Sequence, residues 1–152
     1  MSRPHGPAAP EVFHSLALAH HRSDQLDHCL LIPLGSRRVA CCARCLGLYP
    51  TLALLLLLQG FFSWPVPGPL ERWLLAAGVL PALLDWGSSW LDRTRGNNLI
   101  RVITGCLLGV SLGRSLWVYF RDPLYEVLWI QVGLLALGAL IFELLRLRRL
   151  LR

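Results

Sequence analysis

Three cysteines within five residues, Cys41, Cys42 and Cys45, form the most chemically distinctive feature of this chain. The C-x-x-C spacing of Cys42 and Cys45 is typical of half of a tetrahedral thiolate site for zinc. Cys29 lies upstream with a histidine beside it, so three thiolates and one imidazole are available for a Cys3His site. Such ligands also suit iron or copper(I). The predicted metal ligands are Cys29, Cys42, Cys45 and His28, with His20 or His21 as the alternative to His28.

Thiol–disulfide chemistry at Cys42 and Cys45 is the alternative function for the same motif. Arg44 inside the motif, and a helix beginning at Cys45, would both favour a reactive thiolate. No thioredoxin-like βαβ pattern surrounds the motif, which weakens this interpretation. In a third interpretation the cysteines are small residues at a membrane interface with no shared role.

A second polar group surrounds Asp85, which lies inside an apolar stretch. An ionisable residue at membrane depth is a functional hypothesis by default. Asn98 and Arg101 begin the next apolar stretch. We predict that Asp85, Asn98 and Arg101 form a polar, candidate catalytic cluster, whose arginine would hold a lipid-like or phosphate-bearing ligand. The structural alternative is a buried Asp85–Arg101 ion pair that joins two helices.

The elements that must position these residues are membrane spans. The chain is 55% hydrophobic and 16% charged, whereas soluble domains carry about 25% charged residues. Four stretches reach spanning length: residues 46–64, 73–91, 99–120 and 124–145. The sequence therefore predicts an all-α polytopic membrane protein with four transmembrane helices, preceded by a Cys/His-rich cytoplasmic segment. The expected parts are a disordered N-terminus (1–10), the Cys/His-rich segment (11–45), the transmembrane domain (46–145) and a basic cytoplasmic tail (146–152).

Arginine placement predicts the orientation. The formal net charge is +6, and arginines concentrate before the first predicted span, between the second and third, and after the fourth. The positive-inside rule then places both termini in the cytoplasm, in a bacterial inner (plasma) membrane. The thiols would face a reducing compartment, which favours metal binding over a disulfide. No basic stripe is interleaved with exposed aromatic residues, so we expect the lipid bilayer as partner and no nucleic acid.

The third predicted span contains Gly105, Gly109 and Gly113, four residues apart on one helical face. Small residues at this spacing let a second helix approach closely. The partner helix is either internal or from a second copy, in a homo-oligomer. A non-catalytic membrane assembly subunit is therefore a further alternative function.

The residue order resembles a family of small prokaryotic membrane proteins known as domain of unknown function 2085. The resemblance extends from about Cys29 to Gly113. It rests on Cys-Ala-Arg-Cys-Leu-Gly-Leu-Tyr at residues 42–49, the intramembrane Asp85, and Asn-Leu-Ile-Arg-Val-Ile-Thr-Gly at residues 98–105. It implies the fold and the location of a site, and it names no activity.

Overall fold

A computed structural model gives the fold, and it describes residues 12–13, 29–34, 37–62, 64–91 and 97–151. Three strands come first: β1 (Val12–Phe13), β2 (Cys29–Leu34) and β3 (Arg37–Cys42). Five helices follow: α1 (Ala43–Phe61), α2 (Pro69–Ala77), α3 (Leu80–Leu91), α4 (Asn98–Arg121) and α5 (Glu126–Leu150). The predicted disordered segment 1–10 lies outside the described residues.

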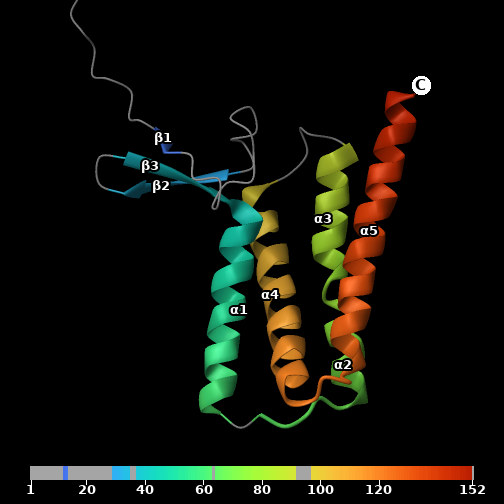
Figure 1. Cartoon of the computed structure of the whole chain (residues 1–152). Helices are drawn as coiled ribbons and strands as arrows, with labels where there is room; N and C mark the ends of the chain where they lie inside the picture. Colours follow the sequence, from blue (N-terminus) through green and yellow to red (C-terminus); the bar gives the residue numbers. More distant parts are fainter. Residues whose placement is uncertain (1–11, 14–28, 35–36, 63, 92–96, 152) are drawn as a thin grey trace, which may run out of the picture.

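The helices form an upright bundle with the small sheet across one end (Figure 1). Within the described part of the chain, three helices are long and apolar enough to cross a membrane: Ala43–Phe61, Asn98–Arg121 and Glu126–Arg149. The predicted first, third and fourth spans correspond to these helices. The predicted basic tail, residues 146–152, is not separate from the last helix. Helix α5 continues to Leu150 and includes most of the arginines of that tail.

The predicted second span, 73–91, is not one helix. It is divided between α2 and α3 by a turn at Gly78 and Val79. Pro81 explains the break, because proline has no N–H and its ring clashes with the carbonyl four residues earlier. That carbonyl belongs to Ala77, the last residue of α2. Together α2 and α3 follow the length of α5 (Figure 1).

Helix α1 packs along α4 more extensively than any other pair of helices. The glycine stripe makes this approach possible: a Cβ on Gly105 would lie 2.4 Å from the Arg44 carbonyl oxygen, and one on Gly109 would lie 2.7 Å from that of Leu48. The stripe is thus filled by α1 of the same chain. Assembly into homo-oligomers stays a prediction, and it would need another surface.

The prediction of an all-α chain is wrong at the cysteine-rich segment, which forms the sheet. Its strand order is β1-β3-β2, with β1 parallel and β2 antiparallel to β3. Pro33 in β2 disfavours a helix there, and Ile32 and Val39 are β-branched residues that suit a strand. The hairpin runs directly into α1, so strand register controls where the motif cysteines lie.

Candidate functional site

The β2–β3 register brings two distant cysteines together. Cys29 and Cys42 are direct partners in the antiparallel pair, and both are buried. Opposite residues in such a pair have Cβ atoms only about 4.5–5.5 Å apart. Cys29 is thereby placed beside the C-x-x-C motif from 13 residues upstream.

Cys45 completes a group of three thiols. Cys42 is the N-cap of α1 and keeps the backbone of an extended residue (φ −58°, ψ 126°). The chain turns into the helix there, so Cys45 lies in the first turn. Its thiol is hydrogen-bonded with that of Cys42 and is close enough to Cys29 to interact with it electrostatically. All three predicted cysteine ligands therefore meet at the junction of sheet and helix.

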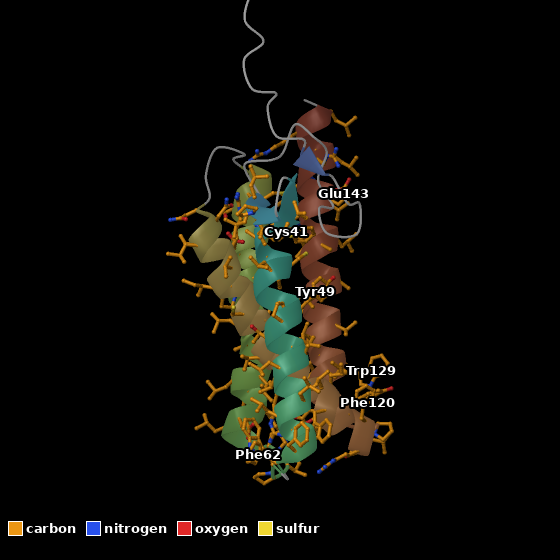
Figure 2. All side chains as sticks on the ribbon, turned by 90° about the vertical axis from the view of Figure 1, so that its left-hand side faces the viewer. Cys41, Tyr49, Phe62, Phe120, Trp129 and Glu143 are labelled. Carbon is orange, nitrogen blue, oxygen red and sulfur yellow. The ribbon has the colours of Figure 1, made fainter. Side chains whose placement is uncertain are left out.

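The other two cysteines are separate from this group. Cys41 pairs with Leu30 across the hairpin and projects to the opposite face of the sheet from Cys42, because side chains alternate along a strand. Figure 2 shows Cys41 at the end of α1 opposite to Phe62. Cys106 lies in the middle of α4. All five cysteines are free thiols.

The histidine part of the predicted site is untested. His20, His21 and His28 all lie outside the described residues. Among the residues that the structure does describe, no group of three or more His, Cys, Asp or Glu side chains has a ready-made metal-holding arrangement. The ligand set thus remains a prediction, supported by the three converging thiols.

Asp85 is held by the arginine of the cysteine motif. Arg44 Nε donates to Asp85 Oδ2, and Arg44 Nη2 donates to the Ser89 hydroxyl at 2.9 Å and to the Asp85 carbonyl at 3.2 Å. The side chains of Arg44 and Asp85 are 23% and 7% exposed. The predicted Asp85–Arg101 pair is therefore wrong: the buried partner of Asp85 comes from α1, not α4.

Asn98 and Arg101 make a second clamp at the same end of the bundle. Arg101 Nη1 donates to Asn98 Oδ1 at 2.9 Å, and Asn98 Nδ2 donates to the Cys29 carbonyl at 3.5 Å. Asn98 thus connects the start of α4 to the first residue of β2. The three residues predicted as a cluster are therefore distributed over two separate clamps.

The comparison of the chain with protein families gives a match. The family described as "Predicted membrane protein (DUF2085)" matches residues 24–114, more than half of the chain. The chain belongs to this family. The resemblance seen in the sequence is thereby confirmed. No significant match was found among curated proteins, and none among solved structures.

The matched range of DUF2085 covers the whole candidate site. It begins before Cys29, includes Arg44 and Asp85, and ends at Arg114 in α4. Helix α5 lies beyond the match. The matched range thus contains the hairpin, the thiols, both clamps and the tight α1–α4 contact of this chain.

A third polar network, at the opposite end of the bundle, is absent from the sequence-based predictions. Arg114 is buried; it donates to Glu71 Oε1 at 2.9 Å, to Gln59 Oε1 at 2.9 Å and to the Pro65 carbonyl. Its guanidinium also lies over the Trp64 ring, 5.5 Å from the centroid. The signal that could have revealed it is the position of Gln59, Glu71 and Arg114 near the same predicted end of the bundle, because buried polar groups must pair with one another.

Proposed function

We propose that this DUF2085 member is a multi-pass membrane protein that binds a soft transition-metal ion, zinc in the first instance, through Cys29, Cys42 and Cys45. The observation that supports it best is the β2–β3 register, which pairs Cys29 with Cys42 one helical turn from Cys45. Two thiolates on one tetrahedral zinc ion are about 3.8 Å apart, given Zn–S bonds of about 2.3 Å. The hydrogen-bonded thiols of Cys42 and Cys45 are compatible with that separation.

The fourth ligand in this proposal is His28, which precedes Cys29 directly, with His20 or His21 as alternatives. Three thiolates and one imidazole make a closed site of the structural kind. Such a site would fasten the hairpin to the start of α1. The two clamps favour this structural role, because the elements that carry the thiols are already held to the bundle, α1 to α3 and β2 to α4.

We further propose a four-crossing topology with both termini in the cytoplasm of a plasma membrane. Helices α1 and α4 run down the bundle in Figure 1, whereas α3 and α5 run up. The chain must therefore cross between the end of α1 and the start of α4, and α2 with α3 supplies that crossing as a broken span. Broken helices are tolerated in membranes where neighbouring helices satisfy the freed backbone groups. Arginine placement supports the cytoplasmic side for the thiols.

A catalytic role for Asp85, Asn98 and Arg101 on a lipid-like or phosphate-bearing ligand remains a weaker proposal. Its support is the burial of Asp85 and Arg101 close to the thiols. Against it, one carboxylate oxygen of Asp85 is already bonded to Arg44. Asn98 is likewise bonded to Arg101.

Metal analysis of the purified full-length protein tests the proposal. Wild type should contain one zinc ion per chain after growth in zinc-supplemented medium. Cys29→Ser, Cys42→Ser and Cys45→Ser should each lose most of it. Cys41→Ser and Cys106→Ser are the matched controls and should retain it, because neither thiol belongs to the group.

Two outcomes would contradict metal binding. One is wild-type protein without stoichiometric metal. The other is a disulfide between any two of Cys29, Cys42 and Cys45 in protein whose thiols were alkylated inside the cell, which would favour the redox alternative. Mass-spectrometric mapping of the cysteines shows whether each thiol was alkylated or was in a disulfide, and so detects the second outcome.

A further inference from the structure

The β2–β3 hairpin extends beyond the helix bundle. Figure 1 shows the sheet lying across the bundle axis at the end where α1 begins, with the far part of the hairpin reaching sideways past α1. Strand β3 ends at Cys42 and α1 starts at the next residue. The hairpin therefore lies at the level where a membrane-spanning α1 meets the headgroup region.

One face of β2 changes from buried to exposed along the strand. Cys29, Leu31 and Pro33 share that face, because side chains alternate along a strand. Cys29 is 6% exposed, whereas Leu31 is 43% exposed and Pro33 is also exposed. The Cys29 end is covered because it lies over the helices, where Asn98 contacts its carbonyl. Further along β2, which is an edge strand of the sheet, Leu31 and Pro33 lose this cover, whereas Ala40, opposite Leu31 in the central strand β3, stays buried.

The tip of the hairpin is basic. Arg37 and Arg38 open β3, paired with Leu34 and Pro33 of β2. An apolar strand paired at its end with two arginines matches the order of a bilayer surface, from acyl chains to anionic headgroups.

We propose that the hairpin is a membrane-surface element: the Leu31–Pro33 face rests on the bilayer beside α1, and Arg37 and Arg38 bind anionic lipid headgroups. Continuity with the lipid-facing side of α1 supports a bilayer over any other occupant. Tyr49 and Leu57 are exposed on that helix, and Tyr49 lies on the side turned to the viewer in Figure 2. Cys29 and Cys42 point to the same side of the sheet, so the bundle covers one half of this face and lipid covers the other.

Photo-crosslinking in lipid nanodiscs tests the proposal. The photoreactive residue p-benzoylphenylalanine replaces Leu31, Ile32 or Leu57 in the full-length chain, and lipid adducts are measured by mass spectrometry. Position 57, on exposed α1, is the positive control. Position 32 is the matched control, because it is the next residue of the same strand on the opposite face. Position 31 should give adducts at a yield similar to position 57 and well above position 32.

The arginines are tested in the same assay. Adduct yield at position 31 should rise when phosphatidylglycerol is added to phosphatidylcholine discs, and the double variant Arg37→Gln/Arg38→Gln should abolish this rise. Equal yields at positions 31 and 32, while position 57 reacts normally, would overturn the bilayer contact. A rise that persists in the double variant would overturn the headgroup contact. Neither result depends on whether the thiols bind metal.

Discussion

Arg44 of α1 and Asp85 of α3 form an ion pair in which the arginine of the cysteine motif ties the start of α1 to α3. Arg44 also donates to the Ser89 hydroxyl and to a backbone carbonyl of α3. Arg44, inside the C-x-x-C motif, thus connects α1 to α3 in this chain.

Replacing the arginine of this pair should lower the free energy of unfolding. Arg44→Gln leaves the buried carboxylate of Asp85 without its cation, and breaking a buried ion pair typically costs about 3–5 kcal/mol. Because Arg44 is partly exposed, we expect a loss of about 2–3 kcal/mol in the free energy of unfolding in detergent. Tryptophan fluorescence during denaturant titration measures it. Arg146→Gln, which disrupts an exposed i,i+3 pair with Glu143, should cost less than about 0.5 kcal/mol.

The double variant Arg44→Gln/Asp85→Asn extends this prediction. It removes both charges, so it should be more stable than Arg44→Gln alone. A double variant as unstable as the sum of the two single variants would show that the pair is not coupled.

Because α1 and α4 are in close contact, we predict that one methyl group added to α4 at Gly105 lowers the stability of the protein. In Gly105→Ala the new Cβ would lie 2.4 Å from the Arg44 backbone carbonyl. The two helices must separate, which we expect to cost about 1–3 kcal/mol of stability. Gly133→Ala is the control, because a Cβ there meets nothing within 4 Å. Thermal unfolding of both variants in the same detergent checks the prediction, and equal melting temperatures would contradict it.

Arg114, which is buried at the far end of the bundle, should contribute more to the stability of the protein than Arg121, which is exposed on the same helix. Arg114→Gln removes donors to Glu71, Gln59 and the Pro65 carbonyl, so acceptors remain unsatisfied, at about 1–3 kcal/mol each. Arg121→Gln loses one stacking contact with Trp117, worth about 0.5–1 kcal/mol at an exposed site. Denaturant titrations should rank the two variants in that order, and the reverse ranking would refute the network.

Because of Tyr125, which lies between α4 and α5, we expect the stability of the protein to depend on pH in the alkaline range. Burial raises the pKa of its phenol above the ordinary value of 10.0, so the folded protein keeps this proton where the unfolded chain loses it. Stability from this residue is unaffected below about pH 10 and falls as pH rises further. The hydroxyl is buried without a hydrogen-bond partner among the described residues. Tyr125→Phe should therefore match or exceed wild-type stability at neutral pH and gain relative to it above pH 10. Parallel stability curves across this range would contradict the prediction.

The sequence predicted the membrane class and, of its four spans, the three that the structure contains as long apolar helices, because each depends on local composition. Leucine-rich runs of spanning length need no knowledge of their neighbours. The convergence of Cys29 on Cys42 was expected only as a ligand set, since the hairpin that pairs them has no alternation of polar and apolar residues to indicate strands.

The partner of Asp85 could not be predicted because two arginines, Arg44 and Arg101, lie at the same end of the bundle. The rotation of α1 and α4 about their own axes decides which of the two arginines faces Asp85. This rotation is set by the close contact of Gly105 with the α1 backbone. The break before Pro81 was readable from its position and was missed because the surrounding residues are uniformly apolar.

That break has a consequence for biogenesis. Where α2 ends, the Leu75 carbonyl accepts hydrogen bonds from Ser111 of α4 and Gln131 of α5. The ribosome makes both of these residues after α2 and α3. Until then the Leu75 carbonyl has only the local Gly78 N–H, at 3.2 Å, as a donor from this segment, and poorly satisfied backbone groups are costly in hydrocarbon. We therefore expect a cysteine introduced by Ala77→Cys, in a chain whose own cysteines are replaced by serine, to react with water-soluble thiol reagents when the chain is truncated before α4. In full-length chains this cysteine should become protected, once α4 and α5 have entered the membrane and supplied the Leu75 carbonyl with its other donors.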